Sequence, residues 1–481
     1  MRTSCNRFAA YLLAVILAAA PQGFSPTPDV HRALASISGD SLRGNLSFLA
    51  SSLLEGRDTP SRGLDIAAEY IAAQFRRAGL EPAGDDGYFQ TAHMLRATPA
   101  PEGFELRLSV GSRTVPVSKD QVTVVSGRPL ALSGVPVVRI DDAAKLRDVS
   151  VTGKAVVLDA GREGAESPAK TAALPPAVFL QMEDELNRPV VRRLIDPDEE
   201  RARYGGVPRL IVRDPDAVKI LQDAKAGDTG IAVSIKLPAA NTASVTVRNV
   251  AGLMRGSDPA LRDQYILLTA HYDHLGRQDG GAVYPGANDD GSGSVSVIEI
   301  GQALAALPVH PKRSILFMTF FGEEEGSLGA RYYTDHPLVP LSKTVADLNL
   351  EQLGRTDSKA GTEISNATLT GFQYSSVAHT LQEAGALTGV KVYETPGGDD
   401  YFNRSDNLPF AECGIPAHTL VVAFEFSDYH ETGDVWQKID YGNMAKVDRM
   451  IALGLVMLAD SPAAPQWNKD NPNVAPYLRA R

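Results

Sequence analysis

Histidine, aspartate and glutamate residues recur in five short segments between residues 271 and 430 of this 481-residue chain. Imidazole nitrogen and carboxylate oxygen are the donors that proteins offer to zinc. Each segment alone has an ordinary explanation as a polar surface loop or a helix cap, so only their combination is informative. Carboxylates gathered at one place repel one another unless a cation lies among them. The segments are His271-Tyr272-Asp273-His274, Asn288-Asp289-Asp290-Gly291-Ser292, Glu323-Glu324-Glu325, Glu351 and Tyr429-His430.

These segments follow or adjoin apolar runs that are typical of buried strands. The runs are residues 265–270, 314–321, 348–350 and 417–424, with helical patterns at 292–307 and 444–459. Strands alternating with helices predict an α/β fold with a mainly parallel central sheet flanked by helices. In such folds ligands bind outside the carboxyl ends of the strands, which is where the five segments lie.

The remaining chain divides by composition. Residues 31–95 are mainly helical, with a clear 3.6-residue pattern over 63–80 that Gly79 ends. Residues 96–245 are rich in Val and Pro with short alternating runs, such as 105–110 and 155–158, and predict a β-rich insert. The α/β part resumes over 246–460, and an irregular tail is expected over 461–481.

The first 24 residues are typical of a secretory signal peptide. Arg2 and Arg7 precede an apolar run over residues 8–20, which is shorter than the roughly 20 residues needed to span a bilayer. The cleavage position is left open within 18–25. We therefore expect an exported product, periplasmic or extracellular, with no membrane association after signal removal. Cys5 would leave with the signal, so Cys413 would be a lone thiol, expected to be buried and inert.

Composition narrows the function classes further. Hydrophobic residues make up 43% of the chain, which is ordinary for a globular protein. The formal net charge is −11, from 47 Lys and Arg against 58 Asp and Glu. An acidic chain is a poor partner for phosphate backbones, so we expect no nucleic-acid binding.

The motifs resemble those of the zinc aminopeptidases of metallopeptidase family twenty-eight, clan MH, which includes bacterial leucyl aminopeptidase and aminopeptidase Y. The resemblance covers residues 31–95, including the stretch LASSLLEGRDTPSRGLDIAAEYIAAQFRRAGLEPAGDDGYFQ, and residues 246–460. The insert, with VTGKAVVLDAG, is similar to a protease-associated domain. The resemblance implies the zinc exopeptidase fold and two zinc ions per chain.

The resemblance also implies a role for each matching position. His271 would bind the first zinc, with Asp273 behind it to fix the ring tautomer. Asp289 would bridge the two ions, and Glu324 and His430 would complete the second. Glu351 stands where the family more often has Asp, so its extra methylene changes the reach of that carboxylate. The family further implies a cis peptide bond between Asp289 and Asp290.

Two catalytic roles follow. Glu323 would be the general base, taking a proton from the attacking water and passing it to the leaving amine. If residues 323 and 324 are extended, their side chains point in opposite directions, so one can bind metal while the other faces the water. The hydroxyl of Tyr429 is the candidate to stabilise the oxyanion. His274 receives no role and is expected at the surface or as a support behind a ligand.

The sequence thus predicts an exported dizinc aminopeptidase that acts on peptides with a free N-terminus. Three alternatives remain open: a carboxypeptidase or dipeptidase of the same clan, a glutaminyl cyclase, and a receptor-like relative without enzymatic activity. The sequence does not define the preferred N-terminal residue or the oligomeric state.

Overall fold

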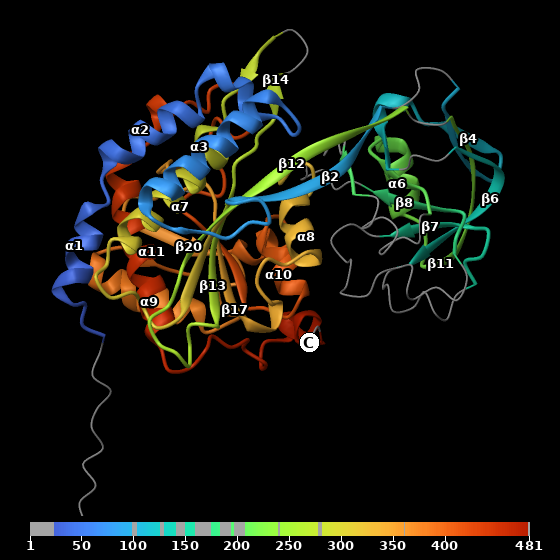
Figure 1. Cartoon of the computed structure of the whole chain (residues 1–481). Coiled ribbons are helices and arrows are strands. Elements are labelled where there is room, and N and C mark those ends of the chain that lie inside the picture. Colours follow the sequence, from blue (N-terminus) through green and yellow to red (C-terminus); the bar gives the residue numbers. More distant parts are fainter. Residues whose placement is uncertain are drawn as a thin grey trace, which may run out of the picture.

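The structure is a computed structural model of the chain. It describes residues 24–98, 103–125, 129–140, 150–158, 175–182, 194–196, 207–238, 241–277, 281–359 and 361–479. The predicted signal segment lies outside these ranges except for Phe24, which packs against the main core. Figure 1 shows two bodies of unequal size joined by a long two-stranded ribbon.

The larger body is built on a mixed sheet, to which ten strands belong among the described residues. Its order is β21-β20-β22-β17-β13-β16-β12-β2-β9, with β1 beside β12. The four strands from β22 to β16 are mutually parallel, and antiparallel strands flank them on both sides. The bounds are β1 Glu81–Pro82, β2 Phe89–Thr98, β9 Leu194–Ile195, β12 Asn241–Met254, β13 Tyr265–His271, β16 Ser314–Phe320, β17 Thr344–Leu350, β20 Asn366–Leu369, β21 Lys391–Val392 and β22 Ala417–Val421.

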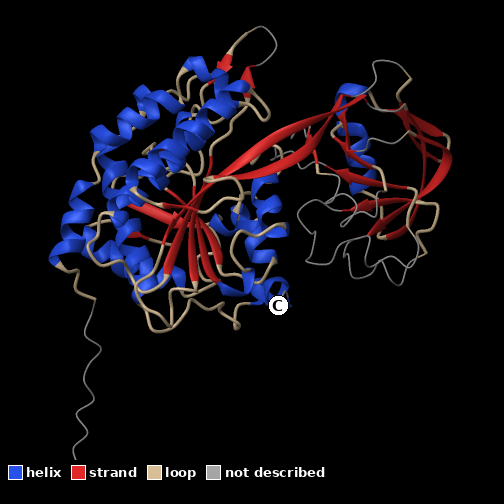
Figure 2. Cartoon of the chain, viewed as in Figure 1, coloured by secondary structure: helices blue, strands red, loops and turns tan. Residues whose placement is uncertain are grey.

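Helices cover both faces of this sheet, which gives three layers (Figure 1, Figure 2). On β13, Ile266 and Leu268 belong to the core cluster on one face, whereas Leu267 belongs to the cluster on the other. Because both faces are buried, β13 and β16 are continuous apolar runs. The first face carries α1 Pro28–Ser36, α2 Gly39–Leu49, α3 Arg62–Ala78, α7 Gly293–Ala305, α9 Val377–Thr388 and α11 Tyr441–Asp460, and the second carries α8 Leu328–Asp335 and α10 Asn407–Glu412.

The smaller body, which we call the insert sheet, lies between β2 and β12 in the chain. In the described residues it has eight strands in the order β4-β3-β11-β6-β7-β8-β10-β5, with one helix, α6, against it. It has its own apolar core. The bounds are β3 Glu105–Val110, β4 Arg113–Pro116, β5 Val122–Val125, β6 Leu130–Ile140, β7 Ala155–Leu158, β8 Val178–Met182, β10 Arg209–Val212, α6 Pro215–Gln222 and β11 Gly227–Leu237.

The ribbon that joins the two bodies is the antiparallel pair β2 and β12. Their register runs from Phe89↔Val250 to Thr98↔Asn241. The sequence boundaries placed at 95/96 and 245/246 fall inside these two strands, where Met94 faces Val245. The chain therefore enters and leaves the insert sheet along one continuous ribbon.

Most elements expected from the sequence are confirmed, among them the helix that Gly79 caps with φ 77°. The tail differs from the expectation. Residues Pro472–Arg479 form a 3₁₀ helix, and the side chain of Val474 is fully buried in the core cluster that also contains Phe410 of α10. Cys413 is only half-buried rather than buried. No helix in the described part of the chain is long and apolar enough to cross a membrane.

Candidate metal centre

The five segments that carry the His, Asp and Glu residues meet at one edge of the larger sheet. His271 is the last residue of β13, Glu351 directly follows β17, and Glu323 comes three residues after β16. Because these strands are parallel, their carboxyl ends lie together. Asp289 reaches the same place from the turn Ala287–Ser292, which leads into α7, and His430 reaches it from the loop after β22. The fold thus assembles the residues that the sequence singled out.

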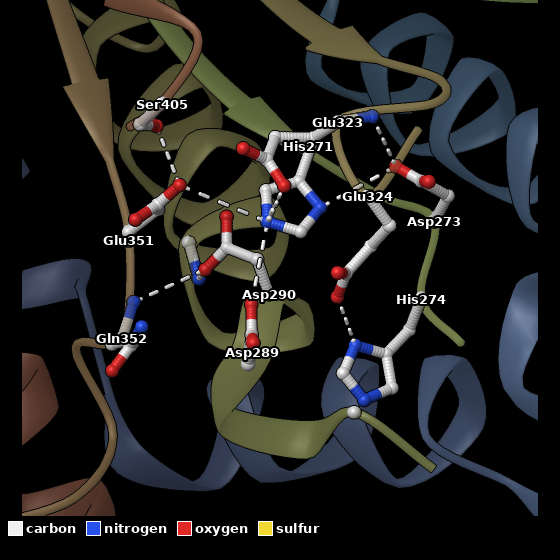
Figure 3. Close-up of polar contacts among 12 residues, drawn as sticks. His271, Asp273, His274, Asp289, Asp290, Glu323, Glu324, Glu351, Gln352 and Ser405 are labelled. Carbon is white, nitrogen blue, oxygen red and sulfur yellow. Dashed lines mark hydrogen bonds and ion pairs between the residues drawn. The ribbon is translucent and has the colours of Figure 1, made fainter. Parts of the chain in front are cut away.

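His271 is held in one orientation by Asp273. Its Nδ1 lies 3.4 Å from Oδ1 of Asp273, and both side chains are buried. Asp273 also accepts hydrogen bonds from the backbone N–H of Glu323 at 3.1 Å and from the hydroxyl of Thr59 at 3.2 Å. A proton on Nδ1 leaves the lone pair of Nε2 for the site. That nitrogen faces Asp289 at 3.4 Å, as Figure 3 shows.

The carboxylate of Asp289 lies between two histidines. Its Oδ1 is the atom near His271, whereas its Oδ2 lies 3.0 Å from Nε2 of His430. The backbone N–H groups of Asn288 and Asp289 donate to the buried carboxylate of Asp434, which fixes the turn. The peptide bond between Asp289 and Asp290 is cis, as expected. One carboxylate therefore presents an oxygen to each side of the site.

Glu323 and Glu324 diverge within a tight turn. Oε2 of Glu323 lies 3.9 Å from Nε2 of His271, while Oε2 of Glu324 lies 3.3 Å from Nε2 of His430. The expectation that this segment is extended is wrong. The N–H groups of Gly326 and Ser327 both donate to the carbonyl of Glu323, so the chain turns there. The side chains separate because of that turn and not because of strand alternation.

Glu351 is oriented by a polar chain from the sheet. The hydroxyl of Ser405 donates to Oε1 of Glu351 at 2.5 Å, and the amide of Asn349 donates to Ser405 at 2.7 Å. The same Oε1 lies 3.9 Å from Nε2 of His271. The longer side chain, which replaces the more usual Asp, therefore still reaches the site.

Tyr429 lies against the last histidine. Its ring stacks on that of His430 with centroids 4.1 Å apart, and it meets Phe426 edge-on. Burial, with the neighbouring carboxylates, holds the pKa of Tyr429 well above its ordinary value. The phenol thus stays protonated and can act as a hydrogen-bond donor.

The site concentrates negative charge away from water. Burial raises the pKa of Glu351 to about 8, with Asp289 adding to the shift and His271 opposing it. Burial also raises the pKa of Glu323 well above its ordinary value. For Asp289 burial acts in the same direction, but the close contacts of its carboxylate with His271 and His430 outweigh it and hold its pKa well below the ordinary value. A cation among these groups would stabilise the ionised forms of all of them.

The donor geometry fits metal ions. Within the described residues, two groups of three donors have ligand atoms that all lie within 4.8 Å of one another. The groups are His271 with Glu323 and Glu351, and His274 with Asp289 and Glu324. The buried Nε2 atoms of His271 and His274 make no hydrogen bond in the described part of the chain. Imidazole and carboxylate donors in this number suit zinc.

Comparison with known proteins identifies the larger body. Residues 249–454 match the model of peptidase family M28. The chain carries a peptidase family M28 domain. It is 29% identical over 218 residues to aminopeptidase YwaD of Bacillus subtilis, which covers 45% of this chain and 42% of that protein. It is 26% identical over 260 residues to a probable zinc metalloprotease of Pyrenophora tritici-repentis, covering 46% and 59%. The chain thus spans about half the length of these two relatives.

A solved structure supports the fold. The aminopeptidase of Aneurinibacillus sp. strain AM-1 superposes with a TM-score of 0.58 at 18% identity, covering 90% of this chain and 97% of that one. The likeness extends beyond the M28 domain, because the matched share includes most of the chain. The predicted α/β architecture is therefore confirmed.

His274 is a residue of the M28 domain whose place the sequence did not show. Of the two places expected for it, the structure contradicts the surface and agrees with a support behind a ligand, because its side chain is fully buried and its Nδ1 lies 2.7 Å from Oε1 of Glu324 (Figure 3). Glu324 thus has one oxygen toward His274 and the other toward His430. The position of His274, three residues after His271 in the sequence, is the signal that could have indicated this contact.

Arg57 supports the loops of the site, a role that could not be predicted from the sequence. The guanidinium is fully buried. It donates to the carbonyl oxygens of Tyr272 at 2.7 Å, Leu49 at 2.6 Å, Pro285 at 2.7 Å and Gly286 at 2.8 Å. Two of these carbonyls belong to the segment before Asp289 and one lies between His271 and Asp273. Arg57 therefore ties together the two loops that carry those residues.

Replacing this arginine should destabilise the M28 domain. Arg57→Lys keeps the charge, but one ammonium cannot reach four carbonyls in a fixed fork. We expect the free energy of unfolding to fall by about 3 kcal/mol, because buried carbonyl groups lose their partners. Chemical denaturation measures the change. Arg449→Lys is the matched control, since within the described ranges the Arg449 guanidinium donates to two carbonyls, those of Leu34 and Ile37. A loss no larger than in that control would contradict the role of Arg57.

Proposed function

We propose that this protein is a zinc-dependent aminopeptidase that holds two zinc ions and removes residues from the free N-terminus of peptides. The observation that carries the proposal is the carboxylate of Asp289, which presents one oxygen to His271 and the other to His430. The names of the relatives, an aminopeptidase and a probable zinc metalloprotease, support the same class.

The ligands would divide into two sets that share Asp289. His271 and Glu351 would complete one set, and Glu324 and His430 the other. A bridging group must offer two oxygens, which a carboxylate does and an imidazole nitrogen does not. When bound, two such ions would polarise the scissile carbonyl and lower the pKa of a bound water.

The chain's own residues would carry the proton and hold the substrate. Glu323 lies beside the ligands without being needed by either set, and its side chain is 14% exposed, so water can reach it. It would take the proton from the attacking water and deliver it to the leaving amine. The hydroxyl of Tyr429 would donate to the oxyanion. The cluster of carboxylates would attract the cationic N-terminus of the peptide.

The first test combines metal analysis with an activity assay on the mature protein. We expect about two zinc ions per chain and release of the chromophore from aminoacyl amides, which a chelator abolishes and zinc restores. N-acetylated amides are the matched control and should not react. Cleavage of C-terminal residues or of dipeptides alone, or cyclisation of N-terminal glutamine, would replace the proposal with the corresponding alternative. Absence of bound metal would favour the receptor-like alternative.

The insert sheet would restrict the cleft to chain ends. Arg96 and Ala243 are cross-strand partners, so a two-residue Asn-Gly turn between them removes the insert sheet while closing the ribbon. We expect the ratio of kcat/KM for long and short peptides to rise in this variant. The ratio is unaffected by a general loss of activity. An unchanged ratio would argue against a role in substrate selection.

The protein would work outside the cytoplasm. Its N-terminal 24 residues carry the charge and apolar pattern of a signal peptide. N-terminal sequencing of the protein from the periplasm or medium should give a first residue within 18–25 or directly after it. An intact Met1 in the mature product would refute export by this route.

A further inference from the structure

One short strand of the larger sheet comes from the insert region. Along the chain, β9 lies between β8 and β10, which are parallel neighbours in the insert sheet. Yet β9 pairs antiparallel with β2, with Leu95 opposite Ile195 and Arg96 opposite Leu194. Leu194 is fully buried in the main core cluster, which also contains Met94 of β2. The chain therefore leaves the insert sheet, docks on the larger body and returns.

The third glutamate of the site loop meets this strand. Glu325 is buried, with 4% of its surface exposed, and its Oε2 accepts a hydrogen bond from the backbone N–H of Leu194 at 3.0 Å. Glu325 directly follows Glu323 and Glu324. Three successive glutamates thus have three different partners: Glu323 lies near His271, Glu324 near His274, and Glu325 binds β9.

The loop that carries Glu323 is held from two sides. Asp273, on the β13 side, accepts the N–H of Glu323. Glu325, two residues after Glu323, binds the backbone of β9. Between these anchors and α8 the backbone adopts positive φ at Gly326 (96°) and at Ser327 (55°). A non-glycine residue in this region is strained, so the loop conformation depends on its contacts with the surrounding structure.

We propose that Glu325 is a positioning residue that couples β9 of the insert region to the loop carrying the general base. This inference rests on the proposed function. A hydrogen bond between a carboxylate and a backbone N–H is among the stronger ones, and here it is shielded from water. The carboxylate of Glu323 must be placed within a few tenths of an ångström of its proton donor, so release of the loop lowers the rate of proton transfer rather than substrate binding.

The kinetic test uses the full-length mature protein. Glu325→Ala should lower kcat about tenfold or more with KM within about twofold and zinc content unchanged. Glu325→Gln should restore most of the activity, because its amide oxygen still accepts the N–H of Leu194. Glu299→Ala is the matched control. Glu299 is equally buried and accepts the backbone N–H of Ser38, but it lies on α7 and not on the loop that carries Glu323. That variant should keep kcat.

A second readout does not depend on activity. Amide hydrogen exchange of residues 194–196, followed by mass spectrometry, should show faster exchange at Leu194 in Glu325→Ala and wild-type protection in Glu325→Gln. Wild-type kcat in Glu325→Ala, an equal defect in Glu325→Gln, or an exchange rate at Leu194 that Glu325→Ala does not change would each overturn the coupling. If the wild type cleaves no aminoacyl amide, the proposed function fails, and exchange at Leu194 alone decides whether Glu325 holds β9.

Discussion

Glu323→Gln should lower kcat by about a hundredfold or more while both zinc ions stay bound. Glutamine has nearly the same shape as glutamate but cannot accept the proton of the attacking water. Glu323 lies 3.9 Å from His271, and its backbone N–H is anchored on Asp273, so the substitution leaves the surrounding contacts in place. The expected loss is therefore confined to the chemical step. Steady-state kinetics with metal analysis of the same preparation measures both quantities.

The control for this variant is Glu425→Gln. Glu425 accepts the hydroxyl of Tyr401 and pairs with Lys359, so it is also a hydrogen-bonded glutamate, but it has no contact with the histidines of the site. We expect its kcat to stay within about twofold of the wild type, as for most surface substitutions. Near-normal turnover of Glu323→Gln would remove Glu323 from the role of base. Loss of zinc in that variant would instead make it a ligand, which the cluster of Glu323 with His271 and Glu351 also permits.

The α/β fold could be predicted because its signal is local. The apolar runs at residues 265–270 and 314–321 correspond to β13 and β16, and each is followed by polar residues at the strand end. Parallel strands require their carboxyl ends to meet, so the positions of His271, Glu323 and Glu351 along the sequence already implied one site. What the sequence could not give is the antiparallel flank, because β2 and β12 are separated by the whole insert.

The supporting residues could not be predicted, because their roles depend on contacts across the chain. Arg57 ends a short 3₁₀ helix, Ser52–Arg57, after α2 and binds the carbonyls of Pro285 and Gly286, more than 200 residues away. Glu325 belongs to an acidic run whose ordinary interpretation is a solvated loop, yet it binds the backbone of Leu194, which is 131 positions away in the chain. These charged residues have a structural role because they are buried against distant segments of the chain. The periodicity of the sequence carries no information about that burial.

Asp273 shows how these supports converge. One of its oxygens lies near Nδ1 of His271 and accepts the N–H of Glu323, so it orients a ligand and the base loop at once. Its other oxygen accepts the hydroxyl of Thr59, in the segment that also contains Arg57. The N-terminal segment and the M28 domain therefore share one set of contacts around the site.

Asp289→Ala should abolish activity and reduce bound zinc from about two ions to one or none. Among the residues that the structure describes, Asp289 is the one carboxylate that faces both His271 and His430, so its loss removes a ligand from each set. Asp289→Asn is the companion variant, since its amide keeps the shape but not the charge. Elemental analysis after dialysis against buffer without chelator measures the metal content.

Asp289→Ala should also show how much the stability of the folded protein depends on zinc bound at this carboxylate. Free zinc at about one hundred times its dissociation constant stabilises a protein by about 2.7 kcal/mol when only the folded state binds it. That value holds for each bound ion, so with two ions we expect zinc to raise the free energy of unfolding of the wild type by about 5 kcal/mol, and to raise that of Asp289→Ala by no more than about half as much. Asp400→Ala, at an exposed acid outside the site, should respond to zinc as the wild type does. Two zinc ions in Asp289→Ala, or an undiminished response to zinc, would refute the bridging role, since the remaining ligands would then suffice to hold both ions without a shared carboxylate.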